Sequence, residues 1–252
     1  MPGVDVVESS SLEVSIEAKS FAVPVLRNVV FSADGGDFLA LLGPSGMGKS
    51  TTLRIVLGLD ADFTGCVRVP GGRIGAVFQE PRLLPWLSLA DNLRLVLTDG
   101  VPPPDIPALF AAVGLAGMHD RFPAQVSLGM ARRVALIRAL AVSPQLLVLD
   151  EPFASLDPSL AANLSTLVSR RARQSGMTVL MATHDLDQAL SMADRILVLS
   201  GHPATLAADE PVAGARLRER LLESFPFLRP GRTLADEDEL ADAAASQGGA
   251  DR

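Results

Sequence analysis

Residues 43–50 are Gly43-Pro44-Ser45-Gly46-Met47-Gly48-Lys49-Ser50, a stretch that fits the pattern G-x-x-x-x-G-K-S of a phosphate-binding loop. It lies between an apolar run at residues 38–42 and a helical pattern at residues 50–58. Glycines let the backbone curl until successive N–H groups converge on phosphate oxygens, and the positive end of the following helix attracts anions. The stretch therefore predicts a nucleotide-binding turn between a strand and a helix of an α/β fold.

The end of this loop carries the side chains that would contact ATP and its metal ion. Lys49 is expected to reach the β- and γ-phosphates, and the hydroxyl of Ser50 is expected to coordinate Mg²⁺. Thr51 follows at the start of the helix and completes the predicted nucleotide-binding segment, residues 43–51. The alternative is a glycine-rich turn with a chance Lys-Ser pair, which the flanking strand and helix disfavour.

Short runs rich in Val, Ile and Leu alternate with helical patterns along the chain, which predicts an α/β fold with a mainly parallel central sheet. Strands are expected near residues 25–31, 38–42, 74–78, 146–149, 178–182 and 196–199. Helices are expected near residues 50–58, 89–97, 106–114, 130–142, 158–174 and 186–193. The strand signal vanishes between about residues 81 and 144, which predicts an inserted helical subdomain. Residues 231–252 are acidic and then rich in Ala, Ser and Gly, so we expect a loosely ordered tail after one domain at residues 1–230.

The composition limits where the protein works and what it binds. Hydrophobic residues make up 48% of the chain, but the apolar stretches are short or interrupted by charge, so we expect no transmembrane segment. Residues 1–11 contain no Lys or Arg, which disfavours a secretory signal and predicts a cytoplasmic protein. A net charge of −7 argues against nucleic acid as a partner. The one cysteine, Cys66, excludes an internal disulfide framework and is expected to be a small apolar residue in a strand.

A further apolar strand, residues 145–149, runs into two carboxylates, Asp150 and Glu151. Acidic side chains at the carboxyl end of a strand face the ligand crevice of an open α/β sheet. Asp150 is expected to hold Mg²⁺ directly or through water, and Glu151 to polarise the water that attacks the γ-phosphate. Alone, an Asp-Glu pair is more often a helix cap or a solvated feature, but the phosphate-binding loop favours the catalytic role.

The order of the remaining motifs separates this chain from other nucleoside triphosphatases. Over about residues 12–208 it resembles the ATP-binding cassette (ABC) family, whose motifs occur here as Gln79, Ser127 with Gly129, Ser155-Leu156-Asp157, and His184. The resemblance implies a P-loop fold of ABC type, with an antiparallel β portion beside the parallel sheet. It also implies that Gln79 contacts Mg²⁺ or the attacking water and that His184 contacts the γ-phosphate. The implied catalytic residues are Lys49, Gln79, Glu151 and His184, and the implied metal ligands are Ser50, Gln79 and Asp150.

The same resemblance implies a dimer in which each nucleotide site is completed by a second ABC subunit, most simply a copy of this chain. Ser127, Gly129 and Asp157 are the residues implied to act across that dimer. The signature segment, residues 126–135, departs from the family pattern LSGGQ at Leu128 and Met130. If Leu128 needs a positive φ, its side chain would cost about 1 kcal/mol or more. The simpler interpretation is a plain helix start capped by Ser127, and both can hold together.

Phe21 lies about twenty residues before the phosphate-binding loop, where the family places an aromatic ring, usually Tyr, that stacks on adenine. This chain contains no Tyr, and Phe keeps the stacking face while losing the hydroxyl. The alternative is a Phe that belongs to the hydrophobic core.

Residues 78–92 are similar to ATPases of the nitrate, sulfonate and taurine importer subfamily. This similarity implies permease subunits in the membrane, a periplasmic solute-binding protein, and a peripheral position on the cytoplasmic side of the inner membrane. Trp86 with Leu83, Leu84 and Leu87 would anchor the permease, although a place in the helical-subdomain core is equally compatible. Residues 216–222 are expected to form a helix, and the C-terminal region is too short for a strand-rich regulatory domain.

Two other functions stay open at this point. A soluble ABC ATPase of a repair, translation or cluster-assembly complex would share the motifs, although this chain lacks a second cassette and coiled-coil insertions. A degenerate nucleotide-binding module is suggested by Leu128 and Met130.

Overall fold

The computed structural model describes residues 3–7, 11–97, 103–154 and 156–230, and the predicted tail at 231–252 lies outside them. The described chain forms two β-sheets. The smaller sheet has the order β1-β5-β2-β3. In it β2 runs antiparallel to both neighbours, while β1 runs parallel to β5. Its strands are β1 (Gly3–Val7), β5 (Thr64–Pro70), β2 (Leu12–Ser20) and β3 (Pro24–Ala33).

The larger, central sheet has the order β10-β9-β4-β8-β7-β6, and only β10 pairs antiparallel with its neighbour. Its strands are β10 (Thr205–Pro211), β9 (Arg195–Ser200), β4 (Phe38–Leu42), β8 (Thr178–Thr183), β7 (Leu146–Asp150) and β6 (Ile74–Val77). The prediction of a mainly parallel central sheet with an antiparallel β portion is confirmed. The strand expected around Cys66 is also present, as β5.

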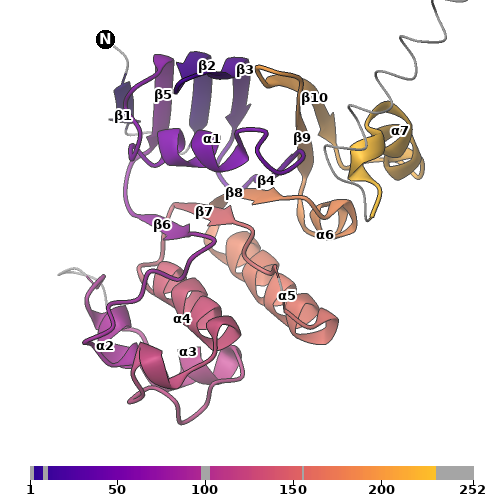
Figure 1. The fold of residues 1–252 in the computed structure, drawn as a ribbon. Coiled ribbons are helices and arrows are strands. Elements are labelled where there is room, and N and C mark those ends of the chain that lie inside the picture. The colour runs from indigo at the N-terminus through magenta and orange to yellow at the C-terminus, as the bar shows by residue number, and fades with distance from the viewer. Residues whose placement is uncertain (1–2, 8–10, 98–102, 155, 231–252) are drawn as a thin grey trace, which may run out of the picture.

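The described helices match the predicted positions to within a few residues. They are α1 (Lys49–Val56), α2 (Leu89–Arg94), α3 (Ile106–Ala112), α4 (Leu128–Ala141), α5 (Pro158–Ser175), α6 (Leu186–Met192) and α7 (Leu217–Ser224), with 3₁₀ turns at Pro123–Gln125 and Pro226–Leu228. Between β6 and β7 the described chain has helices and no strand, and α4 packs on α2 and α3 there (Figure 1). That this stretch is a subdomain of its own stays a prediction. No helix of the described ranges combines the length and apolar character needed to cross a bilayer.

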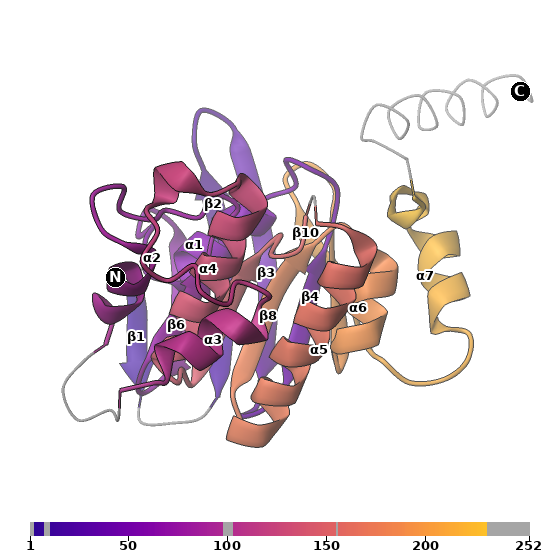
Figure 2. The same cartoon turned by 90° about the horizontal axis from the view of Figure 1, so that it is seen from below.

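Helix α1 lies between the two sheets (Figure 1). The central sheet separates two hydrophobic cores, and its strand β4, which precedes α1, contributes side chains to both. Successive side chains of a strand point to opposite faces, and β4 follows this rule. Leu39 and Leu41 pack toward α1 and the smaller sheet, whereas Phe38, Ala40 and Leu42 pack toward the helices of the other face. That other face carries α5 and α6 side by side (Figure 2). Burial on both faces explains why β4 is a continuous apolar run.

Gly65 is required where β5 pairs with β2. It lies opposite Ile16, beside an irregularity in the register of β2, and its backbone φ is +130°. A Cβ atom at this position would lie 2.0 Å from the carbonyl oxygen of Ser15, which is closer than any side chain packs. Glycine therefore lets the two strands approach at this point.

We expect Gly65→Ala to lower the free energy of unfolding by about 3 kcal/mol or more, because it combines backbone strain with a clash against Ser15. Gly117→Ala is the matched control, since Gly117 also has a positive φ, +75°, but no atom lies within 4 Å of its Cβ position. The control should lose only about 1–2 kcal/mol in urea denaturation. Equal losses in the two variants would contradict the close approach of β2 and β5.

Candidate functional site

The turn from β4 into α1 has the backbone of a phosphate-binding loop. Gly48 is the N-cap of α1 and has a left-handed conformation, with φ 81°. A Cβ atom on Gly48 would lie 2.4 Å from Cδ2 of Leu26 on β3, so the position requires glycine for space as well as for conformation. No side chain caps the first turn of α1, which leaves its backbone N–H groups as donors for an anion.

Lys49 is buried at the base of this loop, with 7% of its surface exposed. Its Nζ donates hydrogen bonds to the carbonyl oxygens of Gly43, at 2.6 Å, and Pro44, at 3.0 Å. Burial lowers the pKa of Lys49, and the nearby charges of Glu151 and Asp150 act against that shift. The ammonium thus donates to the loop backbone and lies near the charges of the two carboxylates. Its contact with the β- and γ-phosphates stays a prediction.

Asp150 ends β7 and faces the same loop. Burial raises the pKa of its carboxyl group, while a hydrogen bond with Ser50 and the charge of Lys49 oppose the rise. Hydroxyl, carboxylate and amide oxygens are ligands that Mg²⁺ accepts, and such sites usually add substrate phosphates and waters to one or two carboxylates. Ser50, Asp150 and Gln79 fit this donor set, since all three line one cavity. Among the described residues, no three His, Cys, Asp or Glu side chains are grouped so that they could hold a metal ion.

Glu151 and His184 form a contact between neighbouring strands. Glu151 follows β7 and has a left-handed backbone with φ 49°, and its N–H donates to the carbonyl oxygen of Ala182 on β8 at 3.0 Å. His184 follows β8, and its Nδ1 lies 2.9 Å and 3.0 Å from the two carboxylate oxygens of Glu151. The parallel pairing of β7 with β8 therefore brings together two residues that are far apart in sequence.

A cavity of about 290 Å³ brings together the predicted metal residues and part of the predicted phosphate-binding loop, whereas the predicted residues Phe21, Gly43, Pro44, Met47 and His184 do not line it. It is lined by Ser45, Gly46, Gly48, Lys49, Ser50, Thr51, Gln79, Asp150 and Glu151. A carboxylate at its wall can accept a proton from water, and the loop and Lys49 can neutralise phosphate charge. The arrangement suits hydrolysis of a nucleoside triphosphate.

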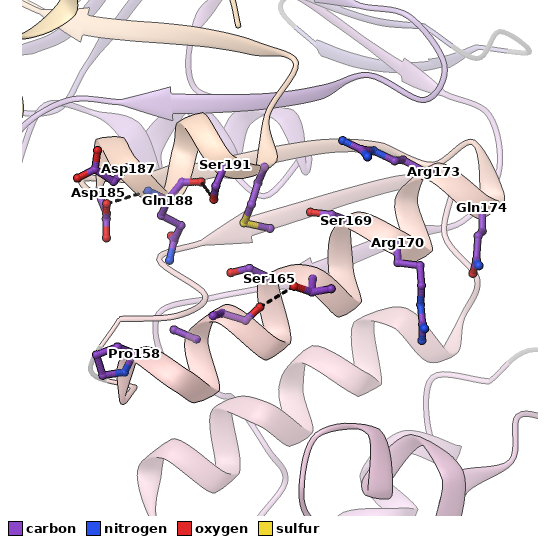
Figure 3. Close-up of a pocket in the computed structure, with 14 residues that line it drawn as sticks. Pro158, Ser165, Ser169, Arg170, Arg173, Gln174, Asp185, Asp187, Gln188 and Ser191 are labelled. Atoms are coloured by element: carbon purple, nitrogen blue, oxygen red, sulfur yellow. Dashed lines mark hydrogen bonds between the residues drawn. The ribbon is translucent and has the colours of Figure 1, made fainter. Parts of the chain in front are cut away.

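A larger groove, of about 810 Å³, lies between α5 and α6. Figure 3 shows Arg170 and Arg173 on α5 at one end, and Asp185 and Asp187 on α6 at the other. None of its lining residues belongs to the phosphate-binding loop. We therefore assign the phosphate chemistry to the smaller cavity, where the charged groups converge.

The signature residues lie on α4, and none of them lines the phosphate cavity. Ser127 is the N-cap of α4, and its Oγ accepts a hydrogen bond from the N–H of Met130 at 3.3 Å. Leu128 is the first residue of the helix, is 58% exposed, and does not have a positive φ. The strain considered for Leu128 is therefore absent. A Cβ atom on Gly129 would make an ordinary 3.6 Å contact with Leu156.

Asp157, the third residue predicted to act across a dimer, is the N-cap of α5. Its Oδ1 accepts from the N–H of Leu160 at 2.9 Å. Ser155, from the same motif, lies outside the described residues. Asp157 does not line the phosphate cavity, so the roles of Ser127, Gly129 and Asp157 across a dimer stay predictions.

Phe21 and Trp86 are exposed, and the alternatives that placed these two aromatic side chains in a core are wrong. Phe21 lies in the turn between β2 and β3 and is 63% exposed. Trp86, in the segment before α2, is 70% exposed. Leu83, Leu84 and Leu87 beside Trp86 are only half-buried.

Two arginines of α4 support the site, although no sequence motif marks their role. Arg138 donates to the carbonyl oxygens of Pro81, at 2.9 Å, and Arg82, at 2.8 Å, just after Gln79. Arg132 donates to the carbonyl oxygen of Ala154, just after Glu151, at 2.5 Å. Their presence on the helix that begins within the signature segment was visible in the sequence, but their carbonyl partners depend on tertiary packing.

Comparisons with known proteins agree with this geometry. A family model described as "ABC transporter" matches residues 26–154, and one described as "AAA domain, putative AbiEii toxin, Type IV TA system" matches residues 119–190. The "Aliphatic sulfonates import ATP-binding protein SsuB 1" of Pseudomonas syringae pv. syringae is 42% identical over 84% of this chain and 90% of its own length. SsuB 1 of Pseudomonas aeruginosa is 43% identical over the same shares. The dimeric MJ0796 cassette bound to ADP and Pi superposes with a TM-score of 0.72 at 26% identity, over 81% of this chain and 99% of that one.

Because Leu128 is helical and unstrained, restoring the glycine of the signature pattern should not stabilise the protein. We expect Leu128→Gly to lower the free energy of unfolding by up to about 1 kcal/mol, through the backbone entropy that glycine loses in a helix. Leu128→Ala, measured in the same urea denaturation, should stay within about 0.5 kcal/mol of the parent chain. A gain in stability for Leu128→Gly alone would contradict the helical conformation of this residue.

Proposed function

Because the chain belongs to the ABC transporter family, we propose that it is the ATP-hydrolysing subunit of an importer for aliphatic sulfonates. The observation that carries the ATPase part is the convergence of Lys49, Ser50, Asp150 and Glu151 on one cavity. The substrate class is supported by the relatives, which are named for aliphatic sulfonate import, and by the subfamily likeness of residues 78–92. The importer subfamily that residues 78–92 resemble also includes importers of nitrate and taurine, which are the alternative substrates.

In the proposed reaction the loop N–H groups and Lys49 bind the phosphates of ATP. Ser50, Asp150 and Gln79 would hold Mg²⁺, which would supply positive charge to neutralise the phosphates. Glu151 accepts a proton from the water whose oxygen attacks the γ-phosphorus while the bond to the bridging oxygen of ADP breaks. His184, in contact with both carboxylate oxygens of Glu151, orients this base beside the γ-phosphate.

The proposed assembly contains two copies of this chain. Ser127 and the backbone N–H of Gly129 lie at the exposed start of α4, where N–H donors and the helix dipole favour an anion. We assign them to the γ-phosphate held by the other copy, with Asp157 connecting the two sites. The dimeric neighbour structure that contains ADP and Pi supports this arrangement.

The proposed membrane partners are permease subunits, with a periplasmic protein that delivers the solute. The chain would sit peripherally on the cytoplasmic side of the inner membrane. Trp86 is a candidate anchor for the permease, because an exposed indole beside half-buried leucines gives a large apolar contact at little entropic cost.

The ATPase role and the substrate are tested together by Glu151→Gln in a host that lacks its own sulfonate-import ATPase and carries the cognate permease. The parent chain should restore growth on an aliphatic sulfonate as the sole sulfur source. Glu151→Gln should not, because its amide cannot accept the proton from water, although it should bind ATP and form an ATP-dependent dimer by size-exclusion chromatography.

Growth on sulfate is the control for general fitness, and Lys49→Ala should lose ATP binding as well as growth. Normal turnover by Glu151→Gln would remove Glu151 from its role. Growth on taurine but not on longer sulfonates, or restored growth on nitrate as the sole nitrogen source in a host without its own nitrate-import ATPase, would change the substrate and leave the ATPase assignment intact.

Trp86→Ala should weaken co-purification of the tagged chain with its permease by roughly 30-fold, the loss expected when a central Trp anchor is truncated. Leu95→Ala is the matched control, because Leu95 is 60% exposed but lies outside the segment at residues 83–87. The control should co-purify like the parent chain. If both variants bind the permease equally well, the anchor lies elsewhere on the surface.

A further inference from the structure

Lys19, near the end of β2, is almost fully buried, with 1% of its side chain exposed. Its Nζ donates to Oδ1 of Asp60 at 2.8 Å and to the carbonyl oxygen of Asp62 at 2.6 Å, and it lies 3.5 Å from Oδ2 of Asp62. Lysine is rarely buried without a partner, and here a carboxylate compensates its charge. Burial alone would raise the pKa of Asp60. The carboxylate of Asp60 accepts hydrogen bonds from Lys19 and from the Asp62 N–H, and these bonds and the nearby positive charge keep the pKa of Asp60 below the ordinary value. The pair is therefore ionic.

The same ammonium lies 4.5 Å from the centroid of the Phe21 ring. A cation at this distance from a ring is attracted by the negative charge of the π face. Lys19 is buried, whereas Phe21 is 63% exposed, so the cation covers the inner side of a ring whose outer side is open to solvent. A planar group can stack on that outer side.

The strand β2, which ends beside the turn that carries Phe21, is connected to the phosphate-binding loop through Leu26. Lys19 pairs in register with Leu26 on β3, and Leu26 is the side chain that packs against Gly48 at the start of α1. Asp60 and Asp62 follow α1 in the chain, so Lys19 ties the β2–β3 turn to the segment that leaves this helix. The turn that carries Phe21 is thereby fixed relative to the phosphate cavity.

We propose that Lys19 is a positioning residue for nucleotide binding: its buried ammonium fixes the ring of Phe21 and polarises it for stacking with an electron-rich purine. The inference rests on the proposed function, because it assumes that ATP occupies the phosphate cavity. The physical basis is that a cation on one face withdraws electron density from the ring, and an electron-poor ring stacks more strongly with adenine on the other face. Lys19 would thus contribute to binding of the base without touching the nucleotide.

If Lys19 has a purely structural role, its loss should weaken binding of every ligand of the phosphate cavity equally. The test therefore compares a ligand that has a base with one that lacks it. Binding of Mg-ATP and of Mg-tripolyphosphate is measured by calorimetry for the parent chain, Lys19→Met, Phe21→Leu and the double variant. Lys19→Met should weaken ATP binding about three- to tenfold, the range expected for a partly desolvated cation–π contact. Binding of tripolyphosphate should not change.

Coupling between the two residues is the second readout. In the Phe21→Leu background, Lys19→Met should cause no further loss of ATP affinity, and Lys19→Arg should retain most of the parent affinity because it keeps the cation. Equal weakening of ATP and tripolyphosphate by Lys19→Met would overturn the proposal. An undiminished effect of Lys19→Met in the Phe21→Leu background would overturn it as well.

Lys19→Met leaves the Asp60 carboxylate without its cation, which can prevent folding. Lys19→Met with Asp60→Leu removes both charges and serves as the second variant, with the same expected difference between the two ligands. Failure of the proposed function is distinguishable, because a parent chain that binds neither ligand, or a Lys49→Ala variant that binds both normally, would show that the phosphate cavity is not the nucleotide site.

Discussion

The close approach of Gly48 to Leu26 is the constraint on which the rest of the structure depends. It allows the chain to leave β4 through a left-handed turn and to start α1 directly beneath the smaller sheet. The contact brings β3 to the first turn of α1, so both sheets pack on the same helix and share one core. The phosphate-binding backbone is therefore part of the packing between the sheets, and its shape is set by the fold rather than by a flexible loop.

The second constraint is electrostatic, because the cavity buries one cation beside two carboxylates. Burial lowers the pKa of Lys49 and raises that of Asp150, and each group partly offsets the cost of ionising the other. Such a set is costly to dehydrate unless its charges are compensated. The two carbonyl oxygens that accept hydrogen bonds from Lys49 contribute to this compensation. In the proposed substrate, the negative triphosphate would compensate Lys49, and Mg²⁺ would compensate the carboxylates.

Sequence patterns predict the strands that are buried on both faces and, apart from β3, miss those that are buried on one. Strand β4 is apolar throughout and β7 is apolar up to its last residue, Asp150, whereas β2 and β10 mix exposed positions with buried or half-buried ones and give no continuous run. The residues that line the phosphate cavity all lie in segments that the motifs mark, because the loop spacing and the strand-end acids are local signals, while their roles stay predictions. Exposure of Phe21 and the backbone angle of Leu128 depend on tertiary packing, which local patterns do not contain.

Helix α4 connects parts of the site that the sequence keeps apart. Its 14 residues span about 21 Å. The signature stands at its start, and Arg132 and Arg138 bind the backbone that follows Glu151 and Gln79. Burial lowers the pKa of Arg138, and its hydrogen bonds to carbonyl oxygens compensate for the lost solvent. A displacement of α4 relative to the central sheet would therefore move the backbone that follows Gln79 and Glu151, the two predicted catalytic residues. In the proposed dimer, the start of α4 would contact the γ-phosphate held by the other copy, and the arginines of the same helix would contact the backbone beside Gln79 and Glu151 of its own site. Helix α4 would thus link the two nucleotide sites.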